Sequence, residues 1–255
     1  MFGGLLAVAV ATELHAQRRF VNSTSARPED FDGSFQFCRV AFSGAWSVDS
    51  PRADINLSIR LSELTHTRVG RTSGGEPHHV VITLNDPELF NCAFIMMTEV
   101  GSANLSESEA RNLRDYLLKG GFLWADDFWG TSAWESWAQQ FNEVLPARDY
   151  PIVDLDPATH PLFRSQFFVS ATPQIASIQH WRSSGGGTSE RGEDSAIVHT
   201  RGVLDKQGNL MALMTHDTDF GDSFEREADD PNYFLLFSRP GYAFGINALV
   251  YAMSH

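Results

Sequence analysis

The segment Leu117–Gly130 constrains the fold of this chain more than any other. It joins the end of a helical pattern to two glycines, an unbroken apolar run and two adjacent acids. Glycine can adopt the left-handed backbone that ends a helix. The apolar run Phe122–Ala125 has no polar alternation, which is typical of a parallel strand covered on both faces. We therefore expect Asp126 and Asp127 at the carboxyl end of a buried strand, the edge of an open α/β sheet where ligands bind.

Strand and helix patterns alternate through the first half of the chain. Apolar or β-branched runs predict strands at 35–42, 80–84 and 93–98. Ser50 is expected to cap a helix that has Pro51 in its first turn, with the apolar stripe Ala53, Leu57, Leu61 and Leu64. The pairs Ser106–Glu109 and Ser132–Glu135 have the spacing of capping boxes and predict two further helices. The second of these carries an aromatic stripe that we assign to the core: Trp134, Trp137, Ala138, Phe141 and Leu145.

The pattern changes after Pro146. Runs at 152–155, 175–181, 196–200 and 210–215 predict strands without helices between them. Ser183–Asp194 has three glycines in a row and no apolar anchor, and it predicts a mobile loop. An apolar stripe from Tyr242 to Met253 predicts a final helix. We expect an α/β, flavodoxin-like fold over residues 34–255, with a mainly parallel sheet, helices on both faces and extra strands in the second half.

The N-terminal residues predict a secretory signal. Met1–Ala16 is small and apolar through Ala11 and ends at a small residue suited to cleavage. No basic residue precedes the apolar run, so a frayed helix is the alternative. Residues 17–33 are polar and predict a tail or linker. The mature protein is then periplasmic or secreted, without a membrane span, because the apolar run is too short to cross a bilayer.

Charge argues against some classes of partner, and cysteine spacing argues against a zinc site. The formal net charge of −13 argues against nucleic acid and anionic membrane surfaces. Solubility is the simplest explanation of this charge, and cation binding requires a specific cluster. The two cysteines, Cys38 and Cys92, do not have zinc-site spacing. We expect two buried thiols in neighbouring strands; pairing in an oxidising compartment is the alternative.

Four motifs together resemble a bacterial family, domain of unknown function 4159. They are Trp46-x-x-Asp49-x-Pro51-x-Ala53-Asp54, Gly120-Gly-Phe-Leu-x-x-Asp-Asp127, Thr218-Asp-Phe-Gly-Asp222 and Gly245-Ile-Asn-Ala-Leu-Val-Tyr251. The resemblance covers residues 34–255. The family is similar in fold to class I glutamine amidotransferases and trehalose-utilisation-type proteins. It implies a flavodoxin-like sheet with Asp126 and Asp127 near the position of the reactive elbow, and it implies no particular activity.

The chain departs from the amidotransferase pattern at the nucleophile. Those enzymes need a thiolate at the elbow, paired with a histidine. No cysteine follows Cys92, which itself precedes its strand, and Cys38 lies inside the first strand. We therefore expect no glutaminase activity of the usual kind.

The paired acids are the first candidate group. In an extended backbone, Asp126 and Asp127 point to opposite faces, so only one of them faces a given pocket. A carboxylate at this edge can act as a general base, as a nucleophile or as a ligand of a hard cation. The alternative is a loop anchor that accepts backbone N–H bonds.

Two other groups flank the paired acids. His216–Asp222, with Glu225, offers several ligand atoms after the strand at 210–215, although a turn rich in Asx hydrogen bonds is the alternative. Arg39 is expected to pair with Asp49, Asp54 or Asp127. Two histidines, His78 and His79, precede a strand and are excluded because they fall at the opposite end of the sheet.

Three functional hypotheses follow. The first is binding of a small polar ligand, a sugar or a cation, in an acidic pocket made by Asp126, Asp127, Asp219 and Asp222, with Trp46 and Trp129 as aromatic walls and Asp49 and Arg39 beside it. The second is a metal-assisted hydrolase in which Asp127 acts as base and His216 as acid or ligand. The third is an interaction module of an envelope assembly. No motif identifies a cofactor or a particular metal, and the first two hypotheses need Asp127, Asp219 and His216 to converge.

Overall fold

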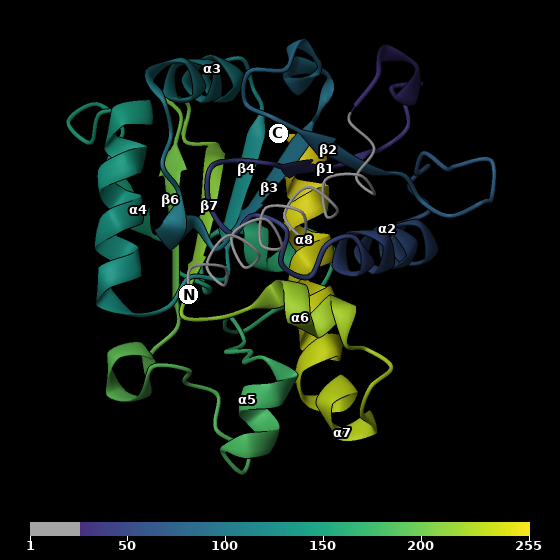
Figure 1. Ribbon diagram of the computed structural model, residues 1–255, viewed down its shortest axis with the longest axis vertical. Helices are drawn as coiled ribbons and strands as arrows, with labels where there is room; N and C mark the ends of the chain where they lie inside the picture. Colours follow the sequence, from purple (N-terminus) through teal and green to yellow (C-terminus); the bar gives the residue numbers. More distant parts are fainter. Residues whose placement is uncertain (1–25) are drawn as a thin grey trace, which may run out of the picture.

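Residues 26–255 fold around one seven-stranded sheet, described here in a computed structural model (Figure 1). The predicted signal lies outside the described residues. The strand order is β2-β1-β3-β4-β7-β6-β5, in which β6 alone runs antiparallel to the other strands. The strands are β1 (Phe37–Val40), β2 (His79–Ile82), β3 (Phe94–Thr98), β4 (Phe122–Asp126), β5 (Ile152–Asp154), β6 (His199–Leu204) and β7 (Leu210–His216). The sheet confirms the predicted mainly parallel α/β architecture.

Helices cover both faces of the sheet. The longer ones are α2 (Arg52–Thr65), α3 (Glu107–Leu118), α4 (Gly130–Val144) and α8 (Arg239–Ser254). Buried side chains of α3 and α4 belong to one apolar core, and those of α2 and α8 belong to the other. Short helices complete the second half: α5 (Ile178–Ser183), α6 (Phe220–Glu225), α7 (Pro231–Tyr233) and the π-helical turn Phe234–Ser238. Single 3-10 turns lie at Pro28–Asp30, Pro87–Asn91, Val100–Ser102, Pro161–Arg164 and Gly192–Ser195.

The position of β4 between two apolar cores explains its sequence. Leu123 and Ala125 point into the core under α3 and α4, while Phe122 and Trp124 point into the core under α2 and α8. An unbroken apolar run is required because both faces are covered. At the turn before β4, Gly120 has a φ of +94°, which favours glycine.

Helix starts are predicted correctly at α3 and wrongly at α2 and α4. Ser106 and Glu109 form the expected capping box of α3. Ser50 does not cap α2: Pro51 holds that position after a cis peptide bond, and the Ser50 hydroxyl lies 2.8 Å from Nε2 of His79. Leu64, expected in the core, is 47% exposed.

The Ser132–Glu135 capping box does not form, because α4 already begins at Gly130. Its first N–H groups bond instead to acids from distant segments, Asp217 at 2.7 Å and Asp194 at 3.0 Å. Such partners satisfy the free donors of a helix start as a local cap does.

The sequence-based prediction for the second half of the chain contains a further error. Residues 175–181, predicted as a strand, contain the start of α5, which Ser177 caps. The expected strand at 196–200 begins later, at His199. The segment 183–194 is held by polar contacts, among them Thr188 Oγ1 to Gln174 Oε1 at 2.8 Å.

Cys38 and Cys92 form a disulfide, so the expected pair of free thiols is wrong. Cys38 lies on β1, and Cys92 lies just before the neighbouring strand β3. Their Cα atoms are 6.2 Å apart, which is within bonding range. Among residues 26–255, no helix combines the length and apolar character that crossing a membrane requires.

Candidate functional site

Acidic side chains gather beyond the carboxyl ends of the parallel strands. We call six of them the acid cluster: Asp49, Asp126, Asp127, Asp219, Asp222 and Glu225. They come from the segment before α2, from the end of β4, and from α6 and the residue that caps it. The central three, Asp49, Asp127 and Asp219, each offer a carboxylate oxygen within 4.8 Å of the others.

Asp126 anchors the structure beneath the cluster. Its carboxylate accepts bonds from Thr215 Oγ1 at 2.5 Å and from the backbone N–H of Phe220 at 2.9 Å. These contacts fix the start of α6 against β7, as the loop-anchor alternative predicted. Burial raises the pKa of Asp126 to about 7, although these hydrogen bonds oppose the rise.

Asp127 turns away from the strand. Its backbone has a φ of +54°, so β4 ends at Asp126 and the two acids do not simply alternate across an extended strand. Trp129 Nε1 donates to Asp127 Oδ1 at 3.0 Å. Burial, followed by the charges of Asp49 and Glu99, raises the pKa of Asp127 well above its ordinary value.

Asp49 and Asp219 complete the central three. Asp219 caps α6 by accepting from the Asp222 N–H at 2.8 Å. Burial and the neighbouring charges of Asp127 and Asp49 raise the pKa of Asp219 well above its ordinary value. Burial, then Asp222, raises the pKa of Asp49 to about 8.

One fully buried carboxylate oxygen in the cluster lacks a hydrogen-bond partner among residues 26–255. Asp49 Oδ2 is buried and accepts no hydrogen bond within the described part of the chain. A Cβ added to Gly221 would lie 2.4 Å from this oxygen, so a glycine is required for the backbone of α6 to approach it.

The outer acids are already partly neutralised. Asp49, Asp222 and Glu225 form a second set with ligand atoms within 4.8 Å of one another. Asp222, however, accepts from the Ile178 N–H at 2.6 Å, and Arg226 lies 3.4 Å from Asp222 and 2.9 Å from Glu225. The central three are therefore the better place for an added positive charge.

Arg39 pairs with Asp54, one of its three predicted partners. Its Nε lies 3.1 Å from Asp54 Oδ2, a second guanidinium nitrogen bonds the other oxygen, and the third donates to Thr98 Oγ1 at 2.8 Å. His79, which we excluded, joins this pair with Nε2 at 2.9 Å from Asp54 Oδ2. Arg39 and Asp54 are both buried and form an ion pair inside the fold.

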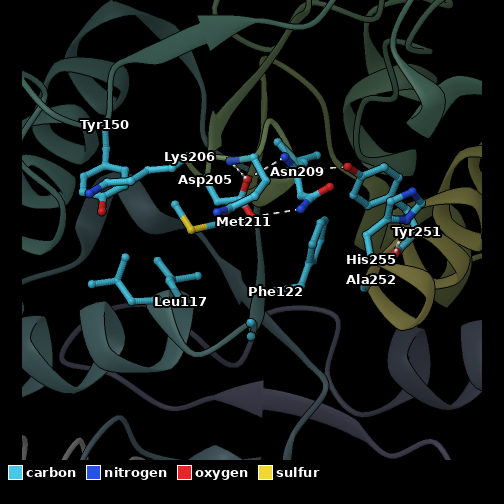
Figure 2. Close-up of a pocket in the computed structure, with 15 residues that line it drawn as sticks. Leu117, Phe122, Tyr150, Asp205, Lys206, Asn209, Met211, Tyr251, Ala252 and His255 are labelled. Carbon is cyan, nitrogen blue, oxygen red and sulfur yellow. Dashed lines mark hydrogen bonds between the residues drawn. The ribbon is translucent and has the colours of Figure 1, made fainter.

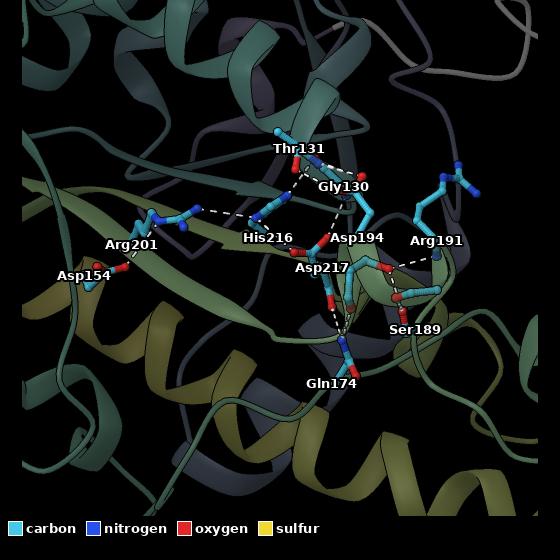
Figure 3. A network of polar contacts seen from close by, with 12 residues as sticks. Gly130, Thr131, Asp154, Gln174, Ser189, Arg191, Asp194, Arg201, His216 and Asp217 are labelled. Carbon is cyan, nitrogen blue, oxygen red and sulfur yellow. Dashed lines mark hydrogen bonds and ion pairs between the residues drawn. The ribbon is translucent and has the colours of Figure 1, made fainter.

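His216 does not join the central acids. Its ligand atom groups with those of His199 and Asp217. His216 and Asp217 are labelled in Figure 3. Consecutive strand residues point to opposite faces, so Thr215 contacts Asp126 whereas His216 packs near Phe128 under α4. The expected convergence therefore holds for Asp127 and Asp219 and fails for His216. Sequence reasoning missed His199, which comes opposite His216 only through the β6–β7 register.

The two predicted aromatic walls differ. Trp129 contacts Asp127, whereas Trp46 is buried in the apolar core under α3 and α4. Three cavities lie elsewhere: one of about 310 Å³ between Leu117, Asn209 and Tyr251 (Figure 2), one of about 820 Å³ between α2 and α8, and one of about 260 Å³ near Phe90. None of these three is lined by a residue of the acid cluster.

Comparison with known proteins identifies a family without a known function. A family model described as a domain of unknown function (DUF4159) matches residues 36–253, nearly all of the described chain. No curated protein matches the chain.

Proposed function

Because the chain belongs to the DUF4159 family, which brings no established activity with it, we propose a function from its own side chains. The acid cluster binds a hard divalent cation, such as Ca²⁺ or Mg²⁺. Asp49, Asp127 and Asp219 supply the ligand oxygens, which is the ligand type these ions prefer.

The unpartnered Asp49 Oδ2 is the observation that carries this proposal. A buried carboxylate without a hydrogen bond is costly, and a second and third carboxylate beside it add repulsion. Without a cation, these groups have to retain protons, which agrees with their raised pKa values. A divalent cation between them offsets both costs.

The cluster suits a cation better than a sugar. A small-molecule site is a cleft of roughly 300 Å³ or more, and the three cavities lie away from these acids. The central side chains are largely buried, with Asp127 and Asp219 at 7% and 5% exposure. An ion needs only the space between the carboxylates.

The geometry gives less support to enzyme chemistry. A hydrolase that pairs Asp127 with His216 requires them together, and His216 groups with other residues. Glutaminase chemistry requires a thiolate, and both cysteines of the chain are held in the disulfide. The disulfide also supports the proposed periplasmic or secreted location, since such bonds persist in oxidising compartments.

Cation titration of chelator-treated protein tests the proposal. We expect Ca²⁺ or Mg²⁺ to raise Tm, because binding adds about 2.7 kcal/mol to the free energy of unfolding when the free ion is at a hundred times its Kd. Calorimetry should show saturable binding. Asp127→Asn removes the charge, keeps an oxygen for Trp129 Nε1, and should weaken binding about tenfold or more.

Asp149→Asn, which changes an exposed acid paired with Arg148, is the matched control and should bind as the wild type does. Two results would overturn the proposal: a wild-type protein that responds to neither ion, or an Asp127→Asn variant that binds them unchanged. The first result, with a co-purifying partner, would favour the interaction-module hypothesis.

A further inference from the structure

We infer that His199, His216 and Asp217 form a separate site for a borderline transition-metal cation such as Zn²⁺. Figure 3 shows two of these residues, His216 and Asp217. One ligand atom from each residue lies within 4.8 Å of the other two. Two imidazoles and one carboxylate are a ligand set that zinc takes in proteins. This inference does not depend on the acid cluster.

Gly130 orients two of the three ligands. Its carbonyl oxygen lies 3.1 Å from His216 Nε2, and because a carbonyl only accepts, Nε2 carries the proton and Nδ1 keeps its lone pair. Its N–H donates to Asp217 Oδ1 at 2.7 Å, which leaves Oδ2 without this bond. Metal-bound histidines commonly donate their other N–H to a backbone carbonyl in this way.

The two remaining ligand atoms face each other. His216 Nδ1 lies 3.2 Å from Asp217 Oδ2. A lone pair against a carboxylate oxygen is unfavourable unless a proton or a cation lies between or beside them. A metal cation bound to both atoms removes this repulsion; without one, the Arg201 guanidinium lies beside Nδ1.

The site is rigid on one side and open on another. The His216 ring is packed against Phe128 and Trp134, with centroids at 5.0 and 5.5 Å. His199 stacks on it at 5.7 Å and is itself only partly buried. Two anchored ligands, His216 and Asp217, and a third that solvent can reach match zinc sites that keep an open fourth position.

Arg201 is the charge that a cation must displace. Its guanidinium lies 3.4 Å from His216 Nδ1, which is long for a hydrogen bond. The same group bonds Asp154 at 3.2 Å and lies over the Trp134 ring at 3.9 Å. These two contacts hold Arg201 without His216, so the weak third contact can be given up.

Titration of the full chain, without a histidine tag, with Co²⁺ tests the site. We expect saturable visible absorption of low-symmetry Co²⁺ that added Zn²⁺ removes. His199→Ala should weaken Co²⁺ binding about tenfold or more. Asp217→Asn should do the same; asparagine tolerates the φ of +63° and keeps an oxygen for the Gly130 N–H.

His66→Asn is the matched control, because His66 is exposed and also has a left-handed backbone. This variant and Asp127→Asn should both keep the Co²⁺ signal, which separates this site from the acid cluster. Absence of a saturable signal in the wild type, or binding by His199→Ala and Asp217→Asn as tight as by His66→Asn, would refute the inference.

Discussion

Arg39 is a buried charge that links three elements: it lies on β1 and contacts Asp54 of α2 and Thr98 of β3. It is fully buried and holds Asp54, which is also buried. Arg39→Met fills the space but removes the guanidinium from the Asp54 carboxylate, which then keeps only the contact with His79 Nε2 at 2.9 Å among its ion-pair contacts within residues 26–255. We expect a loss of roughly 3–5 kcal/mol in the free energy of unfolding, because an uncompensated charge stays buried. Urea denaturation measures this loss.

Arg148→Met is the control for the Arg39 prediction. Arg148 pairs with Asp149 at the surface, and we expect no measurable change because solvent screens such pairs. A loss for Arg39→Met as small as that of the control would contradict the assigned role of Arg39.

At the residue scale, local sequence predicts the position of a side chain in the fold better than the direction in which it points. It correctly places Asp126 at the end of β4 and includes Asp54, the observed partner, among three candidates for Arg39. It misses the positive φ angles of Asp49 and Asp127, because tertiary contacts impose these uncommon backbones. The opposite directions of residues 215 and 216 were predictable, since the strand period alone gives them.

The Cys38–Cys92 disulfide ties β1 to the turn before β3 across a sequence separation of 54 residues. Closing a loop of this length in the unfolded chain is worth about 4 kcal/mol in the chain-entropy model, and measured losses are typically roughly 2–4 kcal/mol. We expect Cys38→Ala/Cys92→Ala to lose stability in this range, as measured by urea denaturation.

A reductant provides the control for the disulfide prediction. It should lower the urea midpoint of the wild type and leave the double variant unchanged. A wild-type midpoint that a reductant does not move, with complete reduction shown by thiol titration, would contradict a stabilising role.

At the element scale, the sequence predicts an element where its signals are local. The capping box of α3 and the apolar run of β4 are complete within their own segments. The start of α4 depends instead on Asp194 and Asp217, and no pattern inside 130–144 indicates them. The short segment at 175–181 reads as a strand because its apolar residues do not distinguish a strand from one helical turn.

At the scale of the whole molecule, the excess of acidic residues and the burial of several of them couple cation binding to the pH dependence of stability. The chain has a formal net charge of −13, and the acid cluster concentrates part of it in the interior. Family membership and overall fold are evident from sequence motifs, but the burial that gives the cluster its properties comes only from packing. The stability of the protein should therefore respond to pH and cations together.

Without a cation, stability should fall as pH rises. The pKa of Asp126 is raised from 3.8 to about 7, and that of Asp49 to about 8. Between pH 3.8 and these raised pKa values, the folded state holds protons that the unfolded state has lost. The stabilisation is therefore complete below 3.8 and is lost as pH rises through about 7 and about 8. With excess chelator, we expect Tm to decline from about pH 5 to about pH 8.

A bound cation should reverse this trend, because it replaces the same protons. Ca²⁺ then competes with protons at low pH and binds ionised carboxylates at high pH, so its stabilising effect should grow across the same window. Asp49→Asn removes one titrating group at a backbone position that asparagine tolerates; it should flatten the Tm profile in chelator and reduce the effect of Ca²⁺. Profiles in chelator that rise with pH, or that are identical in wild type and Asp49→Asn, would mean that these acids do not retain protons in the folded state, and the electrostatic case for a cation among them would fail.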